Sequence, residues 1–266
     1  MNQEKQIVFD ALQMAREAGA SQARINLEKD VENSVTVINN QVDKLLSSSG
    51  STMFIQLYID GCYGSSSTNM LQKDALRSFI RRSTEAAKLI SPDECRTLPD
   101  PAICFHGTAA DLRQYDASIE TLTVEERTAR AMQCSVEVWG RHPKLLSVEA
   151  EWGDDVEYNF TADTQGFEGE TLQSSHTISA NLSLKGRGDE KPESWWYESG
   201  IRREAANVAG CSSKALQRGL DALNPKKIKS GKYNVVLENT VSSKFVSPLL
   251  KALNVEGRTL KVGCRR

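Results

Sequence analysis

The chain has 266 residues, which is enough for one large or two ordinary domains. Its 33 Lys and Arg residues nearly balance its 35 Asp and Glu residues, and the net charge of −2 offers no basic surface for nucleic acid or an anionic membrane. No apolar run is long enough for a transmembrane helix, and the polar first residues lack the pattern of a signal peptide. The composition therefore indicates a cytoplasmic protein with reduced thiols that binds neither nucleic acid nor membrane.

The first 95 residues predict an antiparallel sheet with two helices on one of its faces, an α+β arrangement. An apolar stripe predicts a helix over 3–18, and Gly19 suits the left-handed position after it. Alternation of apolar and polar residues, with a turn signal at Asp60-Gly61, predicts strands. These strands cover 23–27, 34–38, 53–59 and 62–68, and a second helix is predicted for 71–90.

Residues 96–117 predict a linker, because they contain Pro99 and Pro101 and show little periodicity. A central α+β domain is predicted for 118–225. Thr123 and Glu126 form a capping-box pattern, which predicts a helix that ends near residue 138. Alternation predicts a second antiparallel sheet with a turn at residues 153–155 and a last helix capped by Ser212 or Ser213. The strands of that sheet cover 146–152, 156–160, 178–184 and 195–198.

The end of the chain predicts the opening of a third domain. Residues 233–237 are apolar and predict a strand, and a helical stripe follows at positions 241, 245, 249 and 253. A strand and a helix with nothing after them have little to pack on, so we expect the chain to stop as this domain, 226–254, begins. Pro248 is expected to kink the helix, and 255–266 is expected to be a divergent basic tail.

Three segments resemble proteins of the TldD/PmbA family. Residues 223–239 are similar to the entry to the family's C-terminal domain, 160–169 to its hairpin with a small-residue turn, and 193–199 to its aromatic strand. The resemblance extends over about residues 5–254 and consists of a pattern of elements with few distinctive chemical residues. It implies two α+β domains followed by the first strand and helix of an incomplete metallopeptidase-type domain.

The same resemblance implies a subunit without a metal of its own. Catalytic TldD-like chains carry H-E-x-x-x-H on the first helix of the C-terminal domain, where the side chains supply zinc ligands and a base. The matching positions here, 248–253, contain no residue that holds zinc well. The chain therefore resembles the PmbA type, also called TldE, which pairs with a zinc-bearing TldD-type subunit to cleave small or unfolded peptides. We expect it to be inactive alone and to supply structure and substrate enclosure.

No catalytic or metal-binding residue is predicted within this chain. His106, His142 and His176 have no second ligand at a spacing that a regular element would bring together. The aromatic residues Trp195, Trp196 and Tyr197 are candidates for contact with a peptide, because an exposed strand can bind an extended chain. Ordinary packing of these rings between sheet and helix is the commoner alternative.

Two other interpretations of the chain's function stay open. It could be a stand-alone peptide-binding or scaffold module, or a non-functional fragment left by a frameshift or early stop near codon 254. The subunit interpretation predicts a stable complex with a zinc-bearing partner, whereas the module interpretation predicts a monomer that holds peptides by itself.

Overall fold

The computed structural model describes residues 2–93, 95–105 and 111–253, and the chain divides into two units, Met1–Asn224 and Pro225–Arg266. His106, Cys264 and the predicted tail over 255–266 lie outside the described residues. The five described cysteines are free thiols, at positions 62, 95, 104, 134 and 211.

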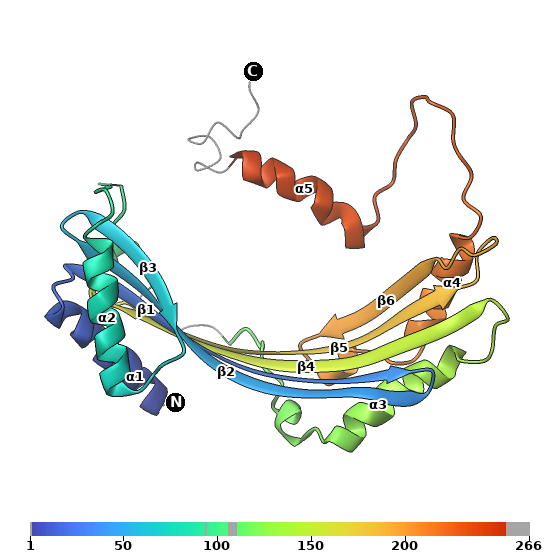
Figure 1. The fold of residues 1–266 in the computed structure, drawn as a ribbon, viewed down its shortest axis with the longest axis horizontal. Helices are drawn as coiled ribbons and strands as arrows, with labels where there is room; N and C mark the ends of the chain where they lie inside the picture. The colour runs from blue at the N-terminus through green and yellow to red at the C-terminus, as the bar shows by residue number, and fades with distance from the viewer. Residues whose placement is uncertain (1, 94, 106–110, 254–266) are drawn as a thin grey trace. The chain divides into compact units, whose positions relative to one another are not determined.

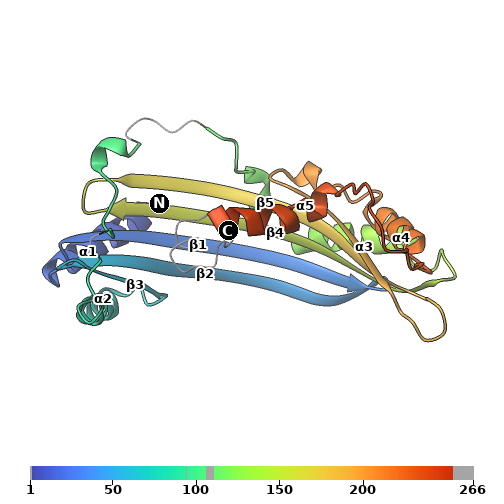
Figure 2. The ribbon, with the colours of Figure 1, turned by 90° about the horizontal axis from the view of Figure 1, so that it is seen from above.

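The first unit is built on one antiparallel sheet of six strands in the order β3-β2-β1-β4-β5-β6 (Figures 1 and 2). The strands are β1 Gln22–Ile38, β2 Gln41–Ile59, β3 Cys62–Thr68, β4 Leu145–Asp163, β5 Glu168–Leu184 and β6 Glu193–Gly200. The α-helices are α1 Asn2–Glu17, α2 Lys73–Ala87, α3 Val124–Val138 and α4 Cys211–Asp221. Short 3-10 turns cover Pro101–Ile103, Ala117–Thr121 and Arg203–Ala205.

The two sheets predicted from the sequence are one sheet, so that prediction is wrong. β1 pairs with β2 on one side and with β4 on the other, from Arg24 opposite Asp163 to Ile38 opposite Glu149. This pairing joins strands that are more than a hundred residues apart in the sequence, which local periodicity does not reveal. The fold class is α+β, and the predicted domain boundaries stay a prediction.

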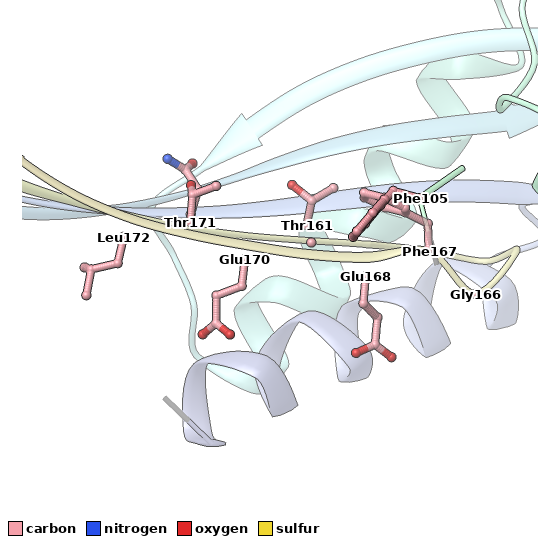
Figure 3. A pocket seen from close by; sticks show the side chains of 10 residues that line it. Phe105, Thr161, Gly166, Phe167, Glu168, Glu170, Thr171 and Leu172 are labelled. Carbon is pink, nitrogen blue, oxygen red and sulfur yellow. The ribbon is translucent and has the colours of Figure 1, made fainter. Parts of the chain in front are cut away.

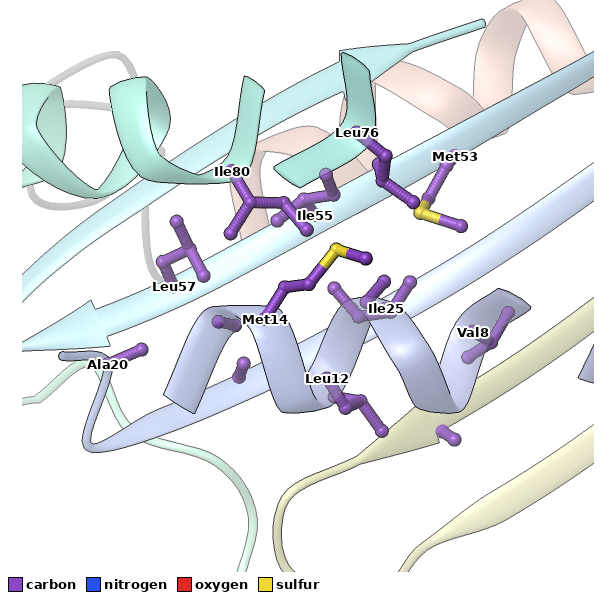
Figure 4. Packing of buried hydrophobic residues seen from close by; sticks show 14 of the residues in the cluster. Val8, Leu12, Met14, Ala20, Ile25, Met53, Ile55, Leu57, Leu76 and Ile80 are labelled. Atoms are coloured by element: carbon purple, nitrogen blue, oxygen red, sulfur yellow. The ribbon is translucent and has the colours of Figure 1, made fainter. Parts of the chain in front are cut away.

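All four helices pack on the same face of this sheet, over two hydrophobic cores. α1 and α2 cover a cluster around Ile25, Ile55 and Phe160 (Figure 4). α3 and α4 cover a second cluster around Val37 and Trp152. Buried residues at odd positions of β1 belong to both clusters, so both lie on one face of the strand. Each of the two predicted domains thus supplies two of the helices, and both contribute residues to both cores and to the shared sheet.

Two predicted breaks in the strands are absent. β1 continues through residues 28–33 because both of its edges are hydrogen-bonded. β4 continues through Gly153–Asp155, which the sequence analysis took for a turn. The carboxylate of Asp154 is buried beneath α3 and bound by Arg127. The residues Gly153–Asp155 have a composition typical of a turn, but here Asp154 forms a buried ion pair within a strand.

The helix predictions hold apart from one cap. Thr123 and Glu126 form the predicted capping box, with N···O distances of 3.2 Å and 3.0 Å. α4 begins one residue before the predicted serine caps, after Gly210 at φ +85°. The Glu137 carboxylate in α3 accepts hydrogen bonds from the Gly210 N–H and from the hydroxyls of the two serines, 212 and 213. The start of α4 is therefore bound by a neighbouring helix.

The second unit contains helix α5, Asn239–Leu253, with Pro248 inside it. The strand predicted for 233–237 is absent, since 232–238 form no regular secondary structure. Val236 in this segment is 96% exposed. A single strand needs a neighbour for its backbone hydrogen bonds, and none adjoins this segment in the described part of the chain.

Candidate functional site

The face of the sheet opposite α1–α4 carries none of the described α-helices of the first unit, and we call it the open face. The register assigns to it the even positions of β1 and the odd positions of β4, β5 and β6, since the alternate positions face the helices. Figure 2 shows the strands from above, side by side along their length. In β1, β4 and β5 the side chains on this face are almost all polar.

Carboxylates dominate the β1 and β4 part of the open face. They are Glu28, Asp30, Glu32, Glu149, Glu151, Asp155, Glu157 and Asp163. Only Asp163 forms an ion pair within the described residues, with Arg24 Nη2 at 2.9 Å. Neutral donors serve three of the others: Thr36 donates to Glu151, Gln173 to Glu157, and Ser175 to Asp155. These bonds occupy carboxylate oxygens and leave the negative charge in place.

Two pairs of these carboxylates lie directly opposite each other in the ladder. Asp30 is the register partner of Glu157, and Glu32 is the partner of Asp155. Like charges at directly opposed positions destabilise a sheet by up to about 1 kcal/mol relative to neutral pairs. The open face therefore keeps a charge arrangement that does not serve folding.

The three aromatic residues predicted to contact a peptide separate onto the two faces of β6. Trp195 and Tyr197 lie on the open face, 56% and 40% exposed, with their rings stacked at 5.7 Å. Trp196 faces the helices, packs against the second core and lies under Lys214, whose Nζ is 3.5 Å from the ring centroid. Peptide contact stays a prediction for the first two, and Trp196 has the packing role that was the alternative.

A pocket of about 810 Å³, which the sequence did not predict, lies beside the turn between β4 and β5 (Figure 3). Phe105 and Phe167 form one side of it, and Thr161 and Thr171 from the open face line it as well. A second pocket of about 600 Å³ adjoins the same part of β5 and is lined by 111–115 and Arg202. The sequence indicated the hairpin turn, but Phe105 comes from the predicted linker, and no local pattern places it there.

The pockets lie along a part of β5 that β6 does not cover. β6 pairs only with residues 176–183, and β4 pairs with the other edge. The Ser174 N–H donates to the Gln114 carbonyl at 2.9 Å, so even-numbered residues of β5 direct their backbone groups away from β4. Among the described residues, no backbone hydrogen bond covers this edge at Glu168, Glu170 and Leu172, which is the kind of edge that an added strand can pair with.

A buried cluster of polar side chains lies on the helix side of the sheet, where it links α3 to β4. Arg127 holds Asp154 through Nε at 2.6 Å and Nη2 at 2.8 Å, and the Trp152 indole donates to the same carboxylate at 3.1 Å. His176 is fully buried beside it, with Nε2 3.7 Å from Asp116 Oδ2. Burial lowers the pKa of His176, so the ring is neutral at neutral pH.

The positions that match the family's metal motif carry no ligating side chain. Positions 248–253 lie in α5, whose sequence has no His, Cys, Asp or Glu. Elsewhere in the described ranges, no group of three such residues could hold a metal ion. His142 lies in a turn, where its Nδ1 accepts from the Lys144 N–H at 3.2 Å. The donor set therefore does not fit the zinc site of a TldD-type chain.

The chain is similar in sequence to a family profile and to curated proteins. Residues 23–87 match the profile described as PmbA/TldA metallopeptidase domain 1. The Haemophilus influenzae protein described as a metalloprotease PmbA homolog is 24% identical over 258 residues, covering 94% of this chain and 55% of that protein. The chain thus spans about half the length of the curated relatives it matches.

Solved structures show the same fold. A Bacteroides thetaiotaomicron protein that bears the name of a DNA gyrase modulator aligns with a TM-score of 0.92 at 31% identity, over 97% of this chain and 58% of that one. TldE from Thermococcus kodakarensis aligns with a TM-score of 0.61 at 15% identity, over 80% of this chain and 47% of that one. No helix in the described ranges is long and apolar enough to span a membrane.

Proposed function

We propose that the chain is a member of the PmbA/TldD family and the PmbA/TldE-like component of a cytoplasmic metallopeptidase that cleaves small or unfolded peptides. In this proposal the chain encloses and positions the peptide, and a TldD-type partner with H-E-x-x-x-H supplies the zinc. The metal in the partner would activate the water that attacks the peptide bond. The observation that carries the proposal is the family fold combined with an α5 that has no ligating side chain.

The sheet supports the enclosing role. The edge of β5 at residues 168–172, which no described strand covers, would offer backbone hydrogen bonds to a peptide of any sequence. Backbone recognition suits an enzyme that acts on unfolded peptides, because the backbone is common to all of them. Trp195 and Tyr197 add exposed apolar area for side chains of the peptide.

The experiment that tests the proposal is co-expression of this chain with a TldD-type chain that carries the motif. We expect a complex that survives gel filtration, contains zinc in proportion to the partner, and cleaves an unstructured peptide. The purified chain alone is expected to cleave nothing. Cleavage by the chain alone, with zinc bound to it, would overturn the assignment.

The second candidate function is a stand-alone peptide-binding module. The observation that favours it is the set of aromatic groups exposed on β6 and the part of the β5 edge that β6 does not cover, which could bind a peptide without a partner subunit. Its signature would be peptide binding by a monomer that forms no complex with TldD-type chains. A DNA-related role receives no support, because the carboxylates of the open face would repel phosphate groups.

A further inference from the structure

We propose that the open face is a docking surface for an extended peptide segment bearing Lys and Arg side chains, which lies along β5 between the carboxylates of β4 and the rings of β6. The inference rests on the proposed function, because this segment would be part of the peptide brought to the partner's metal. It adds a substrate preference, for positive charge, that the family assignment does not contain.

Charge complementarity is the first argument. Seven carboxylates of the open face, at positions 28, 30, 32, 149, 151, 155 and 157, form no ion pair within the described ranges. The whole chain is nearly neutral, so this face concentrates negative charge that other surfaces balance. The field of such a face attracts cationic segments and speeds their encounter.

The opposed carboxylates are the second argument. Asp30 faces Glu157, and Glu32 faces Asp155, and each pair costs stability in the absence of a cation. An ammonium or guanidinium group above either pair would remove that repulsion and gain two attractive contacts. Like charges at opposed positions, which bring no advantage for folding, are typical of a binding surface.

The side chains of β5 and β6 complete the surface. In one cross-strand row, Ser179 separates Glu151 from Tyr197, and in the next row Asn181 separates Glu149 from Trp195. Strands are about 4.8 Å apart, so a carboxylate and a ring flank each short residue at a distance of about 10 Å. A cation between them would contact the carboxylate and the face of the ring, and arginine suits both.

The spacing of the carboxylates favours an extended chain over a single ion. Positions 149 to 157 of β4 span about 26 Å at 3.3 Å per residue, far more than one ion can bridge. A peptide in strand conformation directs every second side chain to one side at about 6.6 Å intervals, which matches the spacing of alternate residues on the sheet. The pocket beside Phe105 and Phe167 lies farther along the same face of β5, next to Thr171, and offers room for an apolar side chain at one end.

The test measures peptide binding to the full chain by fluorescence anisotropy. The probe is a labelled, unstructured peptide of about ten residues, which spans about 33 Å when extended, with Lys and Arg at alternate positions. A matched peptide has Gln at those positions. We expect the basic peptide to bind and the Gln peptide to bind about tenfold more weakly or not at all. Raising the ionic strength from about 0.1 M to about 1 M shortens the screening length from about 10 Å to about 3 Å and should weaken binding further.

A triple variant, Glu151→Gln with Asp155→Asn and Glu157→Gln, locates the site. Each exposed charge pair contributes little, so the three together should weaken binding of the basic peptide about tenfold and leave binding of the Gln peptide unchanged. The matched control removes three helix carboxylates of the exposed surface, through Asp74→Asn, Glu85→Gln and Glu125→Gln. It should bind the basic peptide like the parent. The triple variant should melt no lower than the parent, because it removes the opposed charges.

Three results would overturn the inference. They are equal binding of both peptides, an equal loss in the control variant, and displacement of the peptide by millimolar Mg²⁺ through a site lost in the triple variant. The docking surface and the proposed function fail separately. Basic-peptide binding without a TldD-type complex would remove the subunit role alone, and a complex without basic-peptide binding would remove the docking surface alone.

Discussion

At the scale of single residues, the structure separates two neighbouring aspartates into opposite roles. Asp154 points to the helices and is buried with Arg127, whereas Asp155 points to the open face and accepts a hydrogen bond from Ser175. The sequence shows both within a run typical of a turn. No local pattern distinguishes them, because the partner of Asp154 comes from a helix 27 residues earlier.

We expect Asp154→Asn to lower the free energy of unfolding by about 3 kcal/mol, because it leaves the Arg127 guanidinium buried without its counter-ion. Asp155→Asn is the matched control at the next position. It should change stability by less than about 0.5 kcal/mol or increase it, since it relieves the repulsion from Glu32. Urea unfolding of both variants measures the difference, and equal losses would contradict the assigned roles.

His176 should make stability depend on pH near neutrality. Burial lowers its pKa below 6.5, with Arg203 and Arg130 acting in the same direction and Asp154 and Asp116 opposing them. The unfolded chain therefore binds the proton more tightly, so the contribution is fully present above pH 6.5 and is lost as the pH falls below it. The slope is at most about 1.4 kcal/mol per pH unit.

The comparison that isolates this effect is urea unfolding between pH 5 and pH 7 in two variants. His176→Gln should remove the slope, whereas His142→Gln in the exposed turn should keep it. Carboxylates with a lowered pKa, such as Glu4 at about 2 beside Lys29, cause losses only below pH 4.5 and do not overlap this window. A slope that survives in His176→Gln would assign it to another group.

At the scale of elements, local signals predicted most helices and strand cores, and long-range pairing decided the rest. The capping box at Thr123 and the apolar stripe of α1 depend only on residues close together in the sequence, so both helices could be predicted from it. The continuity of β1 and β4 depends on partners elsewhere in the chain. The separation of Trp195 and Trp196 onto two faces follows from strand alternation, but which face is open depends on where α4 packs.

Helix α4 offers a test of its packing against β5 and β6. Gly219 lies within the helix, where alanine normally stabilises by up to about 1 kcal/mol. A Cβ at this position would lie 2.4 Å from Leu184 Cδ1 and 2.7 Å from Ser194 Cβ. Gly219→Ala should therefore lower the free energy of unfolding by about 1–3 kcal/mol through overpacking.

The control for α4 is Gln217→Ala, an exposed position of the same helix. It should be neutral or slightly stabilising, because alanine has the higher helix propensity. Thermal unfolding of the two variants gives the comparison. A stabilised Gly219→Ala would show that α4 does not lie against β5 and β6 as closely as described.

At the scale of the whole molecule, the near-neutral net charge conceals an uneven distribution. The sequence count gives only the average charge, and it could not show that carboxylates gather on one face. That arrangement needs the register of β1 against β4, which only the fold supplies. The same limit explains why the family resemblance could be recognised from the sequence while the open face and the pocket at Phe105 could not.

The most direct test of the proposed function is the composition of the complex formed with a TldD-type chain. Gel filtration with light scattering and metal analysis of the co-expressed proteins would measure it. We predict a complex of both chains, with zinc in proportion to the TldD-type chain and retained when α5 of this chain is altered by Lys251→Ala. Separate elution of the two chains, or zinc bound to this chain alone, would contradict the subunit role.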